Sequence, residues 1–406
     1  MTSPTLPDRA AARRDFWLIA LLAAVTAVGP FTLHSLSPAL PSVSADLQVP
    51  PAAAQLLLSL SLVAMAVSTL IWGPLSDRYG RRPVLIAGLA TASLGSVLAA
   101  LAPDLWLAVI GRLGQAAGGA AGIVLARAVA QAVFGSERAG DVIGKVTAVM
   151  VAAPMIAPTV SGLLVEASGW RATFWLSAIL CGALVIWIRA GLTETATLTR
   201  PDTKGAGPGD LLAGFRIVGQ RQSFWRHAGY ASFSLAGFYY FVAITPHVMH
   251  ETFGAGPAAY GLYFMMLSAT FMVTNFVAGP ISARFGKERT LVCGAVLSFF
   301  GPVLILVLLL GGAWAPWVLF VPGMVQSFGA GLAMPNATAG AVGAAPERAG
   351  AASGLLGFSQ FMLAAVTTQI AGILPHDTAY WVPGGMILWL ALGLACLWLL
   401  RRRPDA

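Results

Sequence analysis

Long apolar runs constrain this chain more than any other feature of its sequence. An α-helix rises about 1.5 Å per residue, so roughly twenty apolar residues cross the ~30 Å of hydrocarbon in a bilayer. The uncharged stretch 290–346 is too long for one crossing, and the glycines and proline within 311–316 divide it. We therefore expect an all-α membrane protein with twelve transmembrane helices. The predicted spans are 16–37, 54–75, 83–102, 105–133, 142–165, 171–191, 227–249, 258–281, 290–311, 314–339, 349–373 and 380–400.

The composition agrees with lipid as the main solvent. Of the 406 residues, 57% are hydrophobic and only 10% are charged. Soluble domains carry about 25% charged residues. The three cysteines all lie inside apolar runs, so the sequence predicts neither a disulfide framework nor a metal site. The polar start of the chain leads into a full-length span, which argues against a cleaved signal peptide.

The distribution of basic residues predicts the orientation in the membrane. If the N-terminus is cytoplasmic, alternate loops place 21 of the 24 lysines and arginines on the inner side. This is the positive-inside bias of membrane proteins, and it predicts an even number of helices with both termini in the cytoplasm. The net charge of +8 is therefore explained by topology, and we expect no nucleic-acid partner.

Two internal repeats divide the chain into related halves. Residues 73–85 and 279–291 are identical at six of thirteen positions, and residues 137–140 recur as 347–350. The two offsets are nearly equal, as a duplication requires, and an even number of helices per half gives parallel repeats. One chain thus contains a complete two-half unit, which favours function as a monomer. The predicted parts are a cytoplasmic tail 1–15, a six-helix bundle 16–192, a cytoplasmic linker 193–226, a second six-helix bundle 227–400 and a tail 401–406.

The first repeated loop, residues 73–83, resembles the signature loop of the major facilitator superfamily. Residues 153–162, 169–175 and 331–336, with Glu194 and Thr195, are similar to the Bcr/CflA-type drug-resistance exporters of that superfamily. The likeness covers about residues 15 to 400. It implies a cell (inner) membrane protein that exports small amphipathic compounds in exchange for protons, by alternating access between the two halves.

The first repeated loop also holds candidate gating residues. Asp77 can meet the positive N-terminal end of a neighbouring helix, and Arg78 and Arg81 can bridge to facing carboxylates. Contacts made in only one conformer bias which side is open, and the resemblance gives Asp77 and Arg81 this role. Arg127 near the inner end of span four is a further gating candidate, although snorkelling to the surface explains it equally well. Ala283 replaces the aspartate in the second loop, so any latch there is weaker.

Two residues are candidates for proton coupling. Arg112 lies about seven residues into span four, and an arginine at that depth usually faces a functional cavity. In the resembling exporters, the segment matching residues 34–41 usually opens with an acidic residue that serves as a proton site. Here His34 stands in its place, and all sixteen acidic residues can be placed in loops, tails or helix ends. Histidine titrates near neutral pH, so His34 can replace the acid; the alternative is a neutral, hydrogen-bonded histidine.

The expected cavity favours particular substrates. An arginine and a histidine without a carboxylate repel lipophilic cations and accept neutral or weakly anionic compounds. Aromatic side chains suit planar ligands, and polar groups fix their orientation. The predicted substrate-binding residues are Phe31, His34, Arg112, Tyr239, Tyr240, Tyr263 and Asn275.

Span five carries prolines and a glycine that bend a helix and allow close helix contact. The resemblance implies that this segment packs against the other half and is typical of exporters. We expect it to support the movement of the halves rather than to bind ligand. The predicted structural residues are Gly73, Gly80, Pro154, Pro158 and Gly162.

The sequence contains no phosphate-binding loop for ATP, no paired carboxylates and no metal-ligand cluster, so we expect neither an enzyme nor a cofactor. The favoured function is proton-coupled efflux of neutral or weakly anionic drug-like molecules. The alternative is an exporter or facilitator of a natural metabolite, such as a siderophore or a sugar-like compound, without carboxylate-based proton coupling.

Overall fold

The computed structural model describes residues 9–192, 194 and 208–399, and these residues are almost entirely helical, with no strand among them. The short 3-10 turns Ser37–Ala39 and Pro346–Arg348 complete the described elements. The helices are α1 (Arg9–His34), α2 (Leu40–Asp46), α3 (Pro51–Ala54), α4 (Leu56–Tyr79), α5 (Arg81–Ala100), α6 (Leu105–Ser168), α7 (Arg171–Gly191), α8 (Pro208–Gly219), α9 (Gln222–Glu251), α10 (Pro257–Phe285), α11 (Lys287–Leu310), α12 (Trp317–Gly343), α13 (Ala349–Ile373) and α14 (Trp381–Leu399).

The number of membrane crossings agrees with the prediction. Eleven helical segments of the described residues are long and apolar enough to span a membrane, and α6 contributes two of them, Leu105–Phe134 and Val142–Ser168. The twelfth crossing is α9, whose 30 residues pack along α13 and α14. The middle of α9, residues 228–245, carries no charged residue, but its glycine, serine and tyrosine residues make it less apolar than the other spans. The expectation of a twelve-helix membrane protein is therefore confirmed.

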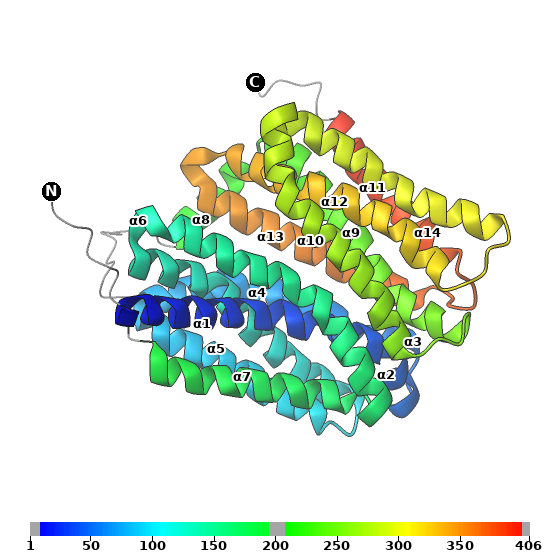
Figure 1. Cartoon of the computed structure of the whole chain (residues 1–406), viewed down its shortest axis with the longest axis horizontal. Coiled ribbons are helices and arrows are strands. Elements are labelled where there is room, and N and C mark those ends of the chain that lie inside the picture. Colours follow the sequence, from blue (N-terminus) through cyan, green and yellow to red (C-terminus); the bar gives the residue numbers. More distant parts are fainter. Residues whose placement is uncertain (1–8, 193, 195–207, 400–406) are drawn as a thin grey trace.

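Helix α6 differs from the expected pair of separate spans, because its backbone stays helical between them. Arg112 on the first limb donates to the carbonyl of Leu33, and Ser161 on the second limb donates to the carbonyl of Ser35. Residues 49 positions apart in α6 therefore meet the same end of α1, so the two limbs lie side by side. Figure 1 shows α6 folding back at the end of the molecule nearest the N-terminus.

Glycines allow the same close helix contact in each half of the chain. A Cβ on Gly118 of α6 would lie 2.2 Å from the carbonyl oxygen of Gly88 on α5. A Cβ on Gly329 of α12 would lie 2.3 Å from the backbone nitrogen of Ser298 on α11. Larger side chains at these positions would push the helices apart. The pair α5 and α6 thus has its counterpart in α11 and α12, at the positions that the repeat predicts.

The helices form two groups in space. Figure 1 shows α1, α5 and α7 on one side, α11, α12 and α14 on the other, and α4 and α13 between them. We refer to α1–α7 as the N-terminal half and to α9–α14 as the C-terminal half. The halves meet mainly where α4 packs on α13 and where α6 packs on α10. Within the predicted linker, α8 packs against α13, with Gly214 beside Ala351 and Phe215 beside Gly354.

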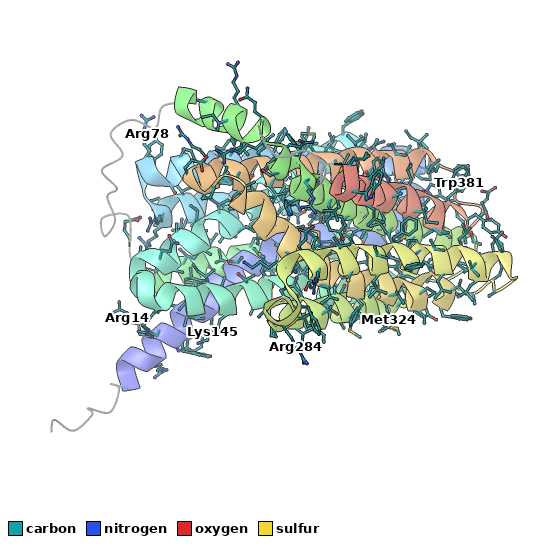
Figure 2. All side chains as sticks on the ribbon, turned by 90° about the horizontal axis from the view of Figure 1, so that it is seen from above. Arg14, Arg78, Lys145, Arg284, Met324 and Trp381 are labelled. Atoms are coloured by element: carbon teal, nitrogen blue, oxygen red, sulfur yellow. The ribbon has the colours of Figure 1, made fainter. Side chains whose placement is uncertain are left out.

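The distribution of basic side chains distinguishes the two ends of the bundle. Figure 2 shows Arg14, Arg78 and Lys145 toward one end and Trp381 toward the other. By the positive-inside rule, the arginine-bearing end is cytoplasmic and Trp381 marks the outer end. The chain is a multi-pass membrane protein in this orientation.

Side-chain amides join the two halves near the outer end. Gln55 donates to the carbonyl of Ala243 at 2.7 Å, and Gln369 donates to the carbonyl of Ala52 at 2.8 Å. Ser59 donates to the side-chain oxygen of Gln369 at 3.0 Å. These five residues link α3 and α4 to α9 and α13, and we call them the outer gate. They hold the outer ends of the halves together.

Candidate functional site

Arg112 lies on the first limb of α6 and is 2% exposed. Its guanidinium donates to the carbonyl of Thr32 at 3.0 Å and to that of Leu33 at 3.3 Å, and also to the side-chain oxygen of Gln115. Thr32 and Leu33 belong to the last turn of α1, where carbonyls lack partners within the helix and carry partial negative charge. Arg112 therefore caps the C-terminal end of α1 with a buried positive charge.

His34 is the last residue of α1 and is 6% exposed. Its ring stacks on Tyr239 with centroids 5.7 Å apart, and it also contacts Phe238 at 5.8 Å and Phe264 at 6.5 Å. The three aromatic residues belong to α9 and α10 of the C-terminal half. A residue of the N-terminal half is thus enclosed by aromatic rings of the other half. We call these four residues and Arg112 the central site.

Among the described residues, the hydrogen-bond partners of Arg112 are neutral oxygens, so dipoles and not a carboxylate solvate its charge. A buried charge is costly unless it is paired and fully hydrogen-bonded. Among the described residues, neither Nε of Arg112 nor Nδ1 of His34 has a hydrogen-bond partner. The central site therefore offers an unused donor on Arg112 and an unused ring nitrogen on His34, beside aromatic faces. This combination can hold an aromatic ligand with an acceptor group or a negative charge.

The other residues predicted to bind substrate lie in different surroundings. Tyr240 donates from its hydroxyl to the carbonyl of Trp381 at 2.7 Å, so its ring is directed toward α14 and not toward His34. Tyr263 stacks on Phe320 of α12 with centroids 5.0 Å apart. Phe31 is half-buried on α1, and Asn275 is half-buried on α10. The structure thus brings together His34, Arg112 and Tyr239 and directs Tyr240 and Tyr263 to other partners, while the roles of Phe31 and Asn275 stay predictions.

The loop between α4 and α5 is shaped by Gly80, whose φ of 97° is a conformation that other residues rarely adopt. The guanidinium of Arg81 donates to the carbonyl of Ala128 on α6 at 3.0 Å. Arg78 is exposed and lies over the ring of Tyr79. These contacts stay within the N-terminal half, and the gating role of the two arginines stays a prediction.

Two further gating candidates, Asp77 and Arg127, have side chains outside the part that the structure describes. Gly73 is half-buried on α4, where a Cβ would lie 4.0 Å from Val124 of α6. This is an ordinary contact distance, unlike the distances of 2.2 and 2.3 Å at Gly118 and Gly329.

The proline-bearing limb of α6 lies against the C-terminal half. A Cβ on Gly162 would lie 2.3 Å from the carbonyl oxygen of Pro257, and a Cβ on Gly261 would lie 2.5 Å from that of Pro158. Pro154 is half-buried one turn before Pro158. Small residues thus allow α6 and α10 to meet backbone to backbone, as the resemblance implies for this segment.

Sequence reasoning missed several residues that the structure places in important contacts. Gln55 holds the outer gate, but it does not stand out among many similar residues in apolar spans. Glu194 accepts from the backbone N–H groups of Arg81 and Arg82, each at 3.1 Å. The signal for Glu194 was available, since it follows span six and faces an arginine-rich loop on the same side of the membrane.

Comparison with known proteins agrees with this architecture. The family model of the Major Facilitator Superfamily matches residues 16–251 and 227–406, so the chain belongs to this family of membrane transporters. It is thus a transporter that takes a small-molecule substrate, and the resemblance of the loop 73–83 is confirmed.

Individual relatives cover nearly the whole chain. The multidrug resistance protein D of Escherichia coli is 26% identical over 395 residues, covering 95% of this chain and 96% of its own. The bicyclomycin resistance protein homolog of Haemophilus influenzae is 27% identical over 377 residues, covering 90% and 92%. The uncharacterized MFS-type transporter YdgK of Bacillus subtilis is 27% identical over 384 residues, covering 93% of each. These names agree with the narrower Bcr/CflA-type resemblance.

Among solved structures, the xylose transporter XylE from E. coli, in a partially occluded inward-open conformation, superposes with a TM-score of 0.73. The match covers 96% of this chain and 98% of XylE at 12% sequence identity. It shows that the fold is that of the family, and the expected fold class is confirmed.

Proposed function

We propose that this protein exports small, amphipathic, drug-like compounds across the cell (inner) membrane by alternating access, in exchange for protons and as a monomer. Neutral or weakly anionic compounds are its favoured substrates. Relatives named for resistance to several drugs and to bicyclomycin support export of this class. The single observation that carries the substrate preference is the buried Arg112, whose hydrogen-bond partners are neutral oxygens.

The central site supports this preference by its chemistry. A cation entering it would meet the charge of Arg112 in a poorly solvated place, where repulsion between like charges is strong. An anionic or acceptor-bearing compound would instead gain the charge-assisted hydrogen bonds that are the strongest in proteins. The rings of Tyr239, Phe238 and Phe264 would stack on its aromatic part.

Proton exchange is assigned to His34. Its ring lies between the two halves, where its protonation would add a charge near Arg112 and disturb the stacking on Tyr239. Protonation of His34 and binding of an anion near Arg112 then affect the same contact between halves. A ligand shifts such an equilibrium only as far as it prefers one conformer. The protein thus needs no carboxylate in mid-membrane for coupling.

The test uses everted membrane vesicles with a respiration-built pH gradient and a fluorescent pH reporter. We expect neutral phenicol-like and anionic aromatic compounds to dissipate the gradient, and ethidium-like cations to have no effect. Arg112→Ala should lower transport about tenfold or more, since a lost hydrogen bond to a charged group costs on the order of 2 kcal/mol. Arg112→Lys should lower it less, because a lysine keeps the charge but not the planar set of donors.

His34→Asn separates coupling from transport. We expect this variant to move labelled substrate without moving protons. If the wild-type protein carries labelled substrate while no compound moves protons, it is a facilitator or metabolite exporter. That is the alternative function suggested by a histidine, His34, at the place of the usual acidic residue. Robust export of ethidium-like cations would contradict the substrate preference. Thermal unfolding of each purified variant shows whether a loss reflects misfolding.

A further inference from the structure

Two histidines meet at the outer end of the C-terminal half, away from the central site. His247 lies one turn before the end of α9 and is 2% exposed, and His376 lies between α13 and α14 and is 6% exposed. Their ring centroids are 4.8 Å apart, with an interplanar angle of 34°. Both ring nitrogens of His247 and Nε2 of His376 lack a hydrogen-bond partner among the described residues. Buried polar atoms without partners are rare in native structures and call for an explanation.

We propose that His247 and His376 form a proton-binding site that loosens the outer gate when protons reach it from the outside. This site goes beyond the proposed function, since it does not depend on which substrate is carried or on coupling at His34.

The position of the pair connects it to the outer gate. Ala243, which accepts the hydrogen bond from Gln55, lies one turn before His247 on α9. Gln369, which bonds to α3 and α4, lies seven residues before His376 at the end of α13. Thr252 donates to the carbonyl of His376 at 3.1 Å and so fixes this segment against the end of α9. The histidine pair thus ties together the two helices that form the C-terminal side of the gate.

The surroundings of the pair favour the neutral form in the closed arrangement. Burial is the main cause that lowers the pKa of His376 from its ordinary value, while Glu251, a hydrogen bond to the backbone of Ala371 and Asp377 act in the opposite direction. Both carboxylates are exposed, as is His250, so they are screened by water. The hydroxyl of Tyr240 is directed to the carbonyl of Trp381 and is not available to the pair. A proton added to either ring therefore places a charge against a second, closely packed ring in a buried position.

Open space at the outer end lies close to the histidine pair. A cavity of about 190 Å³ at the outer end is lined by Pro38, Pro41, Pro246, His250 and Tyr260, among others. It lies between the two halves and reaches the turn of α9 that carries His247. Opening of the outer end would hydrate both rings and let them separate.

The direction of the pH effect follows from this difference. Histidines that are buried when the gate is closed and hydrated when it is open bind protons more tightly in the open state. The closed gate is therefore stable at high pH and is lost as the pH falls below the ordinary histidine pKa of about 6.5. For each proton taken up on opening, the ratio of open to closed gates rises by at most about tenfold per pH unit.

The test measures the gate itself and not transport. Spin labels are attached at Leu101→Cys and Leu310→Cys, which are exposed at the outer ends of α5 and α11, after Cys181, Cys293 and Cys396 are replaced by alanine. Distances between the labels are measured by pulsed electron resonance in lipid nanodiscs from pH 8 to pH 5. We expect a longer-distance population to grow several-fold as the pH falls below about 6.5.

Matched variants assign the effect. His376→Asn and His247→Gln should each remove most of the pH dependence, and two variants guard against one of them failing to fold. His227→Asn is the control, because this histidine lies at the inner end of the same helix, away from the outer gate, and should leave the dependence unchanged. The proposal is overturned if the parent distances do not change with pH, if the change persists in both pair variants, or if His227→Asn removes it equally. None of these outcomes depends on whether the substrate or the coupling proposed above is correct.

Discussion

The two repeated loops of this transporter are held in place by different chemistry. In the N-terminal half, both carboxylate oxygens of Glu194 accept backbone N–H groups at the start of α5, from Arg81 and Arg82. In the C-terminal half, the acid lies within the loop itself, since Glu288 of α11 pairs with the side chain of Arg226 on α9. The first loop is anchored through its main chain and the second through a side chain.

The second pair of repeated segments, residues 137–140 and 347–350, also differs between the halves, because the signs of the charges in its ion pairs are exchanged. Arg138, in the first copy, pairs with Asp15 of α1 at 2.9 Å. In the second copy, Glu347 pairs with Arg221, directly before α9. Each segment is thus tied to the first helix of its own half, with opposite polarity. The two copies keep these inner contacts at matching positions but exchange the signs of the charges. Each contact joins residues of the same half.

Replacing the loop glycines should give the largest effect. Gly80 and Gly286 have φ values of 97° and 90°, so alanine at either site costs about 1–3 kcal/mol in backbone strain. A Cβ on Gly80 would also lie 2.8 Å from a carboxylate oxygen of Glu194, whereas nothing lies within 4 Å at Gly286. We expect Gly80→Ala to lower the Tm of the purified protein more than Gly286→Ala. Equal shifts would show that Glu194 does not anchor the first loop.

Removing each acid should give a medium effect that differs between the loops. Glu194→Gln removes a charge at the positive end of α5 and places an amide donor against a backbone N–H, which costs about 1–2 kcal/mol. Glu288 is 45% exposed, so Glu288→Gln should cost less than about 1 kcal/mol. High salt should reduce the second effect more than the first. Thermal unfolding at two salt concentrations measures both, and a larger loss for Glu288→Gln would contradict the comparison.

Much of this architecture could be predicted from the sequence, because a bilayer imposes simple rules. Apolar length gives the spans, arginine placement gives the sidedness, and the repeated loop gives the family. The expectation that Arg112 lies deep in the membrane is consistent with its burial beside the end of α1. These features depend on local composition or on one residue that is costly to bury, so they can be predicted without knowing how the helices pack.

Contacts between the halves could not be predicted in the same way. Whether Tyr239 or Tyr240 faces His34 depends on the rotation of α9, and two adjacent tyrosines give no periodic signal to decide it. Gln369 meets Ala52 and Ser59 only because α3, α4 and α13 pack side by side. Similarly, His247 and His376 are 129 positions apart, and nothing local in the sequence pairs them.

Exchanging the charges of one exposed pair should give the smallest effect. Asp15→Arg together with Arg138→Asp gives the N-terminal half the polarity of the C-terminal half and leaves the number of inner arginines unchanged, so membrane orientation is not altered. Asp15 and Arg138 have side chains that are 33% and 66% exposed, so each single change should cost less than about 1 kcal/mol.

The double variant should recover most of that loss, apart from the contact of Arg138 over the ring of Phe134, which aspartate cannot make. A double-mutant cycle on thermal stability gives the coupling between the two residues. Failure of the exchanged pair to recover would mean that the first half requires its own polarity. The inversion between the halves would then reflect a functional constraint, and not a free choice of partners after duplication.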